Sequence, residues 1–309
     1  PNIKSPSSAR QLAERILNEL NSPYLINGKL ITVTVSIGIS IFPNDGRNSE
    51  KLLIKADLAM YKAKSSGKNT YQFYTEQLSY LQHRESEIEA HLRKALQNNE
   101  FRLSYQPKYN LITNEIVGAE ILLRWDNAVL GSISPNEFIP VAERSGLIIE
   151  IGNWVLVNSC KQIVAWMNEY NTDLSFSINI SPIQLANSQF LNNLKKILAD
   201  TDYSAQNLEL EITENILMGD SNEISSVLNN IAALGIKFSL DDFGKGYSSL
   251  NRLKMLPIDT LKIDKYFISD IQDEHEKVVI VDIIIKLANE LGMDIIAEGI
   301  ETKAQLNYL

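Results

Sequence analysis

The sequence has almost no cysteine, since Cys160 is the single thiol among its 309 residues. One thiol can form no disulfide within the chain, which excludes the small disulfide-stapled secreted folds and agrees with a reducing compartment. Cys160 lies in an apolar stretch with helical periodicity, and we identify no partner that would activate it. We therefore interpret it as a buried structural thiol.

Histidine is also scarce, and the three histidines are His83, His91 and His275. None of them stands at zinc-ligand spacing from a cysteine or from another histidine. The sequence therefore predicts no zinc site.

No apolar run reaches the length of about 18 residues that a membrane-spanning helix needs. The chain begins at Pro1 and not at a methionine, and its first residues do not resemble a signal peptide. We expect a piece of a longer protein, cytoplasmic and without membrane contact in this segment, whose membrane or sensory region would lie upstream.

Basic residues form no cluster: 29 Lys and Arg stand against 38 Asp and Glu, for a net charge of −9. Electrostatic binding to a nucleic-acid duplex is therefore not expected. The glycine signatures of dinucleotide-binding and P-loop proteins are absent as well. Apolar residues make up 44% of the chain, which is enough for a substantial core.

The first 75 residues predict a small α+β block. Periodic apolar residues indicate helices over 7–20 and 49–64, Asn27-Gly28 indicates a hairpin turn, and 69–74 is typical of a strand. Residues 76–99 predict a charged connecting helix. We also considered a coiled-coil dimer seam for that helix, but the segment is short for one.

From residue 100 to residue 309 strand-like and helical runs alternate, which favours parallel strands in an α/β sheet. Strands are expected over 101–109, 116–126, 175–181, 208–213, 237–243, 260–264 and 294–300, and helices over 148–170, 188–199, 222–234 and 275–291. This pattern predicts a TIM-like (β/α) barrel that lacks its last unit. A doubly wound open sheet is the alternative.

Acidic and amide side chains recur where the predicted strands end. The clearest case is Asp241-Asp242, which closes an apolar strand directly before a glycine-rich turn. Two carboxylates at about 4 Å repel each other by roughly 4 kcal/mol at an effective dielectric constant of 20, so a divalent cation is the natural partner for such a pair. The strand-end set is Arg124, Asn179, Glu211, Glu214, Asp241, Asp242, Lys262, Asp264, Glu298 and Glu301.

Each of these residues also has an ordinary structural interpretation. A strand-end acid is often a helix cap, Arg124 would pair with a surface acid, and Lys262 would extend its ammonium to solvent. Their convergence on one edge of a barrel favours a site instead. Oxygen ligands suit Mg²⁺ or Mn²⁺, and two such ions can hold both the attacking and the leaving oxygen of a phosphodiester.

The motifs resemble those of the EAL family of cyclic di-GMP phosphodiesterases over residues 85–309. The family's name motif is present as Glu120-Ile-Leu-Leu-Arg-Trp125, with Ile121 in place of the usual alanine. Further matching segments are Tyr105-Gln-Pro107, Ser134–Pro140, Ala142–Gly146, Asn179–Pro182, Glu211–Glu214, Asp241–Gly244, Leu261–Asp264 and Ala297–Thr302.

The resemblance implies a barrel that linearises cyclic di-GMP to pGpG with a metal-activated water. It implies that Glu120, Asn179, Glu211 and Asp241 hold a first ion, and that Asp241 and Asp242 hold a second, with Asp264 nearby. It implies that Lys262 and Glu298 orient the water, with Glu211 counted in the catalytic set, and that Gln106 and Arg124 contact the substrate. Glu301 would brace the loop after Asp242, which in this family couples metal binding to a homodimer through the barrel.

Two departures from the family pattern concern that loop and the end of the chain. Lys245 stands where threonine is commoner, which adds a positive charge near the metals. The family's last strand is not among these residues. The first block resembles the C-terminal part of a GGDEF domain, through Val35–Ile39, Ala56–Lys64 and Ser66–Asn69, without the cyclase signature. We expect no diguanylate cyclase activity from it.

Three functions remain open at this point. The retained acids favour a Mg²⁺- or Mn²⁺-dependent phosphodiesterase. A catalytically silent receptor that binds cyclic di-GMP and signals through the connecting helix is the alternative. A scaffold without nucleotide binding is the third and weakest possibility.

Overall fold

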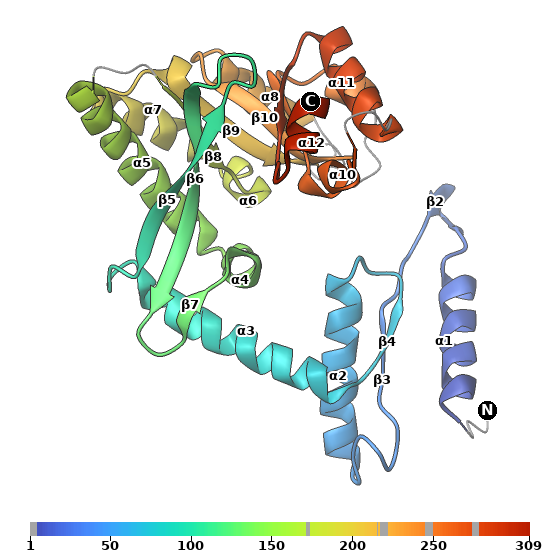
Figure 1. The fold of residues 1–309 in the computed structure, drawn as a ribbon. Coiled ribbons are helices and arrows are strands. Elements are labelled where there is room, and N and C mark those ends of the chain that lie inside the picture. Colours follow the sequence, from blue (N-terminus) through green and yellow to red (C-terminus); the bar gives the residue numbers. More distant parts are fainter. Residues whose placement is uncertain (1–4, 171–173, 215, 217–221, 245–249, 274–277) are drawn as a thin grey trace. The chain divides into compact units, whose positions relative to one another are not determined.

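The chain folds into two compact units, Pro1–Ala90 and His91–Leu309. The computed structural model describes residues 5–170, 174–214, 216, 222–244, 250–273 and 278–309 (Figure 1). The division falls inside helix α3 (Glu76–Ala95), the helix that we predicted as the connector. Each unit is therefore described by itself.

Among its described residues, the first unit contains two short sheets, two complete helices and most of α3. Its elements are α1 (Pro6–Leu20), β1 (Tyr24–Ile26), β2 (Lys29–Ile31), β3 (Ile37–Ile39), α2 (Ser49–Ser65) and β4 (Tyr71–Phe73). Strands β1 and β2 form the predicted hairpin, whose turn has φ of 51° at Asn27 and 77° at Gly28. At Gly38 of β3, a Cβ atom would lie 1.9 Å from the carbonyl oxygen of Ala56, so only glycine lets α2 pack this closely.

The second unit is built on an α/β sheet whose first two strands form an antiparallel hairpin. Its strands are β5 (Phe101–Tyr109), β6 (Ile116–Asn127), β7 (Gly131–Ile133), β8 (Ser175–Asn179), β9 (Leu208–Thr213), β10 (Lys237–Phe243), β11 (Thr260–Ile263) and β12 (Asp294–Ala297). The described helices of this unit are α4 (Pro135–Ser145), α5 (Ile148–Tyr170), α6 (Pro182–Leu185), α7 (Phe190–Thr201), α8 (Asn222–Ala232), α9 (Leu250–Leu253), α10 (Lys265–Ser269), α11 (Val279–Leu291) and α12 (Lys303–Tyr308), and a 3₁₀ turn lies at Ala205–Asn207.

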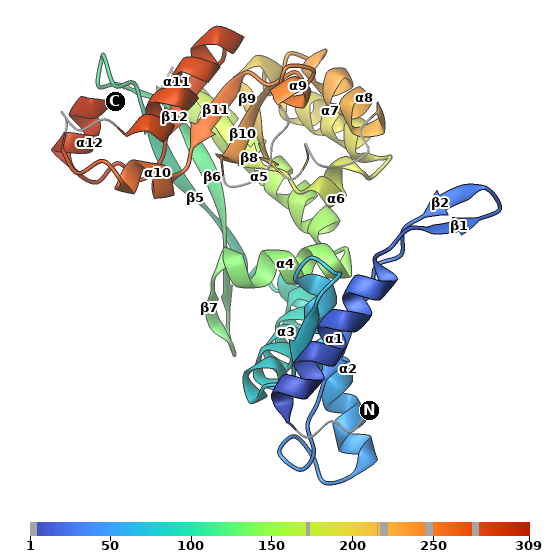
Figure 2. The ribbon, with the colours of Figure 1, turned by 90° about the vertical axis from the view of Figure 1, so that its right-hand side faces the viewer.

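The sheet runs in the order β12-β11-β10-β9-β8-β6-β5, with β7 paired to β6. Neighbours from β6 to β12 are parallel, as predicted, and Figures 1 and 2 show the sheet curling like part of a barrel wall. Among the described residues, the pairing order ends at β12 on one side and at β5 on the other. The fold is thus the predicted TIM-like arrangement, and a doubly wound sheet is not formed.

The prediction of parallel strands is wrong for the first pair, because β5 and β6 are antiparallel. Only residues 110–115 connect them, and a parallel connection needs a crossover of a dozen residues or more. The Asn110 side chain closes this turn by accepting hydrogen bonds from the amides of Ile112 and Thr113 at 2.8 and 3.1 Å. The short elements β7, α4, α6, α9, α10 and α12 were not predicted.

The central strands separate an apolar face from a charged one. Along β9, Leu208, Leu210 and Ile212 are fully buried in the core that α5, α7, α8 and α11 complete. The alternate residues Glu209 and Glu211 are also buried, at 4% and 1% exposure, on the opposite face. Acidic side chains are rarely buried unless they are paired, so the inner face of the sheet must supply partners for them.

Two further sequence predictions can be compared with the structure. Cys160 is buried in α5, and burial raises the pKa of its thiol to about 11, which agrees with a structural rather than a nucleophilic thiol. Within the described ranges, no helix combines the length and the apolar character that crossing a membrane requires.

Candidate functional site

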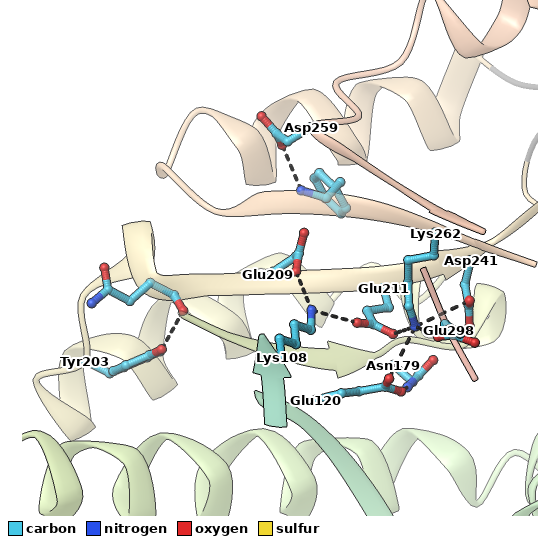
Figure 3. A network of polar contacts seen from close by, with 12 residues as sticks. Lys108, Glu120, Asn179, Tyr203, Glu209, Glu211, Asp241, Asp259, Lys262 and Glu298 are labelled. Carbon is cyan, nitrogen blue, oxygen red and sulfur yellow. Dashed lines mark hydrogen bonds and ion pairs between the residues drawn. The ribbon is translucent and has the colours of Figure 1, made fainter. Parts of the chain in front are cut away.

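The inner face of the sheet gathers four carboxylates around one ammonium group. Lys262 on β11 is 1% exposed, and its Nζ atom lies at the centre of the group (Figure 3). The carboxylate oxygens and their distances from Nζ are Glu211 Oε2 at 2.5 Å, Glu298 Oε1 at 2.7 Å, Glu120 Oε2 at 3.3 Å and Asp241 Oδ1 at 3.4 Å.

Strand pairing explains why these residues meet. Asn179 ends β8 opposite Glu211 of β9, and its Nδ2 donates a hydrogen bond to Glu120 Oε1 at 2.7 Å. Glu298 follows β12, and its amide still bonds to the carbonyl of Ile263 on β11 at 3.0 Å. Each of these side chains thus comes from the carboxyl end of a strand or from its inward face, where barrel enzymes build their sites.

The surroundings raise the pKa of two of these carboxylates and lower the pKa of a third. Burial raises the pKa of Glu120 to about 6, helped by the charge of Glu211 and opposed by Lys262. Burial likewise raises the pKa of Asp241, against the attraction of Lys262. The pKa of Glu211 is instead lowered: burial opposes this, but Lys262 and Lys108 together outweigh it. Glu211 is therefore more firmly ionised than Glu120 and Asp241.

Lys262 remains charged because its four acidic neighbours outweigh burial and raise its pKa. If all four carboxylates are ionised, the group carries four negative charges and one positive charge, a net of −3. Such an excess in a buried place favours binding of a cation.

Lys108 and Glu209 belong to this network, but sequence reasoning missed them. Lys108 Nζ on β5 donates to Glu209 Oε2 at 2.8 Å and to Glu211 Oε1 at 3.3 Å. Strand parity was the signal that could have found them. Lys108 shares a face with Gln106, and Glu209 shares one with Glu211.

The other predicted acids take local positions. A register irregularity in β10 between Leu240 and Phe243 gives Asp242 a φ of 57°, and its amide bonds to Asp241 Oδ1 at 2.9 Å. Asp264 caps α10 by accepting a hydrogen bond from the amide of Tyr266 at 2.7 Å. Their predicted metal roles stay predictions.

The two predicted substrate contacts lie on the β5–β6 hairpin. Gln106 pairs directly with Glu120 across the strands, so both side chains face the same side. Arg124 lies four residues beyond Glu120 along β6 and donates to the carbonyl of Leu123 at 3.2 Å. Both stay predictions as substrate contacts.

The buried side chain of Gln305 joins the loop after β12 to helix α10, which follows β11. Its Oε1 accepts hydrogen bonds from the amides of Glu301 and Thr302 at 2.7 and 3.0 Å, and its Nε2 donates to the carbonyl of Ile268 at 3.3 Å. Lys245 and the rest of 245–249, the loop segment that Glu301 was expected to brace, lie outside the described residues. Before that segment, Glu214 Oε2 accepts a hydrogen bond from the amide of Gly244 at 3.1 Å.

The donor set fits a divalent cation in chemistry and in charge. The side chains that converge on Lys262 offer carboxylate oxygens, the ligands that Mg²⁺ and Mn²⁺ prefer. In the part of the chain that the structure describes, no three acidic, histidine or cysteine side chains surround an open point ready for a metal ion. The ammonium of Lys262 fills the centre of the carboxylate group instead.

Glu120 allows a prediction about pH. Its pKa of about 6 in the fold lies above the ordinary value of 4.5, so the folded state holds this proton more tightly than the unfolded state. The stabilisation is complete below pH 4.5 and is lost as the pH rises through 6. It amounts to about 2 kcal/mol for a shift of about 1.5 units.

We therefore expect Glu120→Gln to gain about 2 kcal/mol over the parent between pH 4.5 and pH 7.5, because glutamine does not titrate. Urea unfolding in EDTA at the two pH values measures this difference. Glu115→Gln, an exposed change before β6, is the control. An equal difference between variant and parent at both pH values would contradict the assignment.

Comparison with known proteins extends these observations. A family model described as "EAL domain" matches residues 89–309, and one described as "Diguanylate cyclase, GGDEF domain" matches residues 1–70. The "Bifunctional diguanylate cyclase/cyclic di-GMP phosphodiesterase MucR" of Pseudomonas aeruginosa is 36% identical over 306 residues, 99% of this chain and 45% of that protein. The "Cyclic di-GMP phosphodiesterase NbdA" of the same organism is 35% identical over 301 residues, 97% of this chain and 38% of that protein.

A solved structure shows the same fold. "PaMucR Phosphodiesterase, c-di-GMP complex" superposes with a TM-score of 0.68 at 37% identity, covering 72% of this chain and 90% of the other. The chain thus spans less than half the length of the two curated relatives, but nearly all of this solved phosphodiesterase chain.

Proposed function

The chain belongs to the EAL domain family, and we propose that it hydrolyses cyclic di-GMP to linear pGpG in a reaction that requires Mg²⁺ or Mn²⁺. The phosphodiesterase names of its relatives support the substrate class. The observation that carries the proposal is the group of Glu120, Glu211, Asp241 and Glu298 around Lys262. Buried charges are costly to desolvate, so this group favours a catalytic role over the silent receptor.

We assign the oxygen ligands from the resemblance to EAL domains together with the carboxylate group around Lys262. Glu120, Asn179, Glu211 and Asp241 would hold one ion. Asp242, with Asp241 and Asp264, would hold a second. When bound, two divalent ions would lower the pKa of a water molecule and offset the charge of the phosphate oxygens.

The residues of the chain then have separate tasks in the hydrolysis. The water oxygen adds to phosphorus, the bond from phosphorus to the 3′ oxygen breaks, and a proton ends on that 3′ oxygen. Lys262 and Glu298, whose Nζ and Oε1 atoms lie 2.7 Å apart, would orient the water and hold its proton. Gln106 and Arg124 would contact the substrate beside Glu120.

The direct test is to incubate the chain with cyclic di-GMP and Mn²⁺ and to follow pGpG by chromatography. We expect pGpG to appear with Mn²⁺ or Mg²⁺, to disappear with EDTA, and to return when Mn²⁺ is added in excess. Tight binding of cyclic di-GMP without any product would contradict the proposal and favour the silent receptor. Calorimetry with Ca²⁺ in place of Mn²⁺ measures that binding, and no binding at all would favour a scaffold.

Two wider properties also belong to this proposal. We expect the protein to act in the cytoplasm, and to form a homodimer through the barrel. Light scattering of the purified chain at increasing concentration measures the second property.

A further inference from the structure

A second layer of charge lies beside the carboxylate group, and the proposed function gives it no task. It consists of Lys108 on β5 and Glu209 on β9, both visible in Figure 3. Glu209 precedes Glu211 by two residues on the same face of β9. Lys108 pairs with Gly118, which precedes Glu120 by two residues on β6. The pair thus lies two residues further from the carboxyl ends of β6 and β9 than Glu120 and Glu211 do.

These two side chains are well buried for charged groups. The exposed fraction is 15% for the Lys108 side chain and 6% for that of Glu209. Two charges held this deeply are costly to desolvate, and a pair of apolar residues could occupy the same space at lower cost. The pair is therefore better explained by what it does to its neighbour than by stability.

That neighbour is Glu211, and each of its two carboxylate oxygens accepts a hydrogen bond from a different lysine. Lys108 Nζ binds its Oε1 at 3.3 Å, and Lys262 Nζ binds its Oε2 at 2.5 Å. Two ammonium groups on the two oxygens fix both the position and the plane of the carboxylate. Glu209 in turn holds Lys108 at 2.8 Å, so that Lys108 cannot turn away.

We propose that Lys108, held by Glu209, is a positioning residue that sets the carboxylate of Glu211 for cation binding. The inference rests on the proposed function, which takes Glu211 as a ligand of a divalent ion. Residues that orient a metal-binding side chain contribute strongly to metal affinity, and their loss typically weakens metal binding about 10–100-fold.

Simple electrostatics predicts the opposite effect of losing Lys108 on cation affinity. Removing a positive charge beside a cation site strengthens cation binding by Coulomb attraction. The double variant Lys108→Met/Glu209→Gln removes one charge of each sign and leaves the net charge unchanged. Any loss of cation affinity in this variant reports the orientation of Glu211 rather than the charge.

The experiment is a calorimetric titration of the metal-free chain with MnCl₂, followed by steady-state kinetics with cyclic di-GMP. For the double variant we expect the Mn²⁺ dissociation constant to rise about 10–100-fold and kcat to fall at least about tenfold. We expect KM to stay within about twofold, because neither residue is one of the proposed substrate contacts. Lys108→Arg should recover most of the Mn²⁺ affinity, since it restores a charged donor to both acids.

The matched control is Arg102→Met/Asp126→Asn, which removes a charge-balanced, exposed pair 2.7 Å apart from the same β5–β6 hairpin. Parent-like Mn²⁺ affinity and kcat in a folded Lys108→Met/Glu209→Gln variant would overturn the inference. If that variant shows no cooperative unfolding, the single variant Lys108→Met is titrated with Mn²⁺ instead. Weaker Mn²⁺ binding than in the parent supports the inference, and tighter binding overturns it. A parent chain that binds Mn²⁺ but leaves cyclic di-GMP intact would refute the proposed function alone, because the titrations still decide the role of Lys108.

Discussion

Glu120→Gln is expected to lower kcat/KM for cyclic di-GMP by at least about 10²–10³-fold, because it removes a proposed ligand of the divalent ions that would stabilise charge in the transition state. The change keeps the shape of the side chain and removes one negative oxygen from the group around Lys262. The Glu120 oxygens now lie 3.3 Å from Lys262 Nζ and 2.7 Å from Asn179 Nδ2, so the side chain sits inside the proposed cation site.

The measurement is the rate of pGpG formation at saturating Mn²⁺, with Glu115→Gln as the control. The same variant is expected to be more stable than the parent at pH 7.5, because it no longer buries an acid with a raised pKa. Loss of activity with a gain in stability would separate a direct role in the site from damage to the fold. Activity equal to that of the parent would overturn the assignment of Glu120 as a ligand.

Lys262→Met is expected to lower the free energy of unfolding by about 3–5 kcal/mol in EDTA, because it leaves buried carboxylates without their counter-charge. The ammonium of Lys262 contacts Glu120, Glu211, Asp241 and Glu298, all within 3.4 Å. In the absence of metal this side chain stands where positive charge is needed. Urea unfolding of the variant and the parent measures the loss.

A divalent cation should restore much of this stability. A ligand that binds only the folded state stabilises it by about 2.7 kcal/mol at one hundred times its dissociation constant. We therefore expect Mn²⁺ to raise the unfolding midpoint of Lys262→Met more than that of the parent. Lys237→Met, an exposed change on β10, is the control. Cyclic di-GMP binding should be reduced less than turnover, and an unchanged stability in EDTA would contradict the role given to Lys262.

Much of the architecture could be predicted from local pattern. The bounds of β5, β9 and β10 agree with the predicted strands residue for residue. Apolar and polar residues alternate along β5 and β9, and along β10 as far as Asp241, so the hydrophobic effect selects one face for the core. Short elements such as α10 and α12 escaped prediction because a few residues carry too little periodicity to be detected.

The candidate site was partly predictable for the same reason. Glu120, Glu211, Asp241, Lys262 and Glu298 lie on the inner face or at the carboxyl ends of strands, which follows from parity and parallel direction. What the pattern did not indicate is which atoms touch. A hydrogen bond depends on the register between strands and on side-chain torsions, and neither is encoded in spacing along one strand.

The sequence by itself determined the family, the oxygen-rich character of the site and the strand on which each acid lies, because these depend on residue type and on periodicity along the chain. Only the tertiary structure decided that β5 runs antiparallel to β6, that Lys262 lies among four carboxylates and that Lys108 and Glu209 hold Glu211. These contacts join residues up to 142 positions apart, as between Glu120 and Lys262. Charge–charge energies change steeply with distances of a few ångströms, and the packing of strands in three dimensions sets those distances.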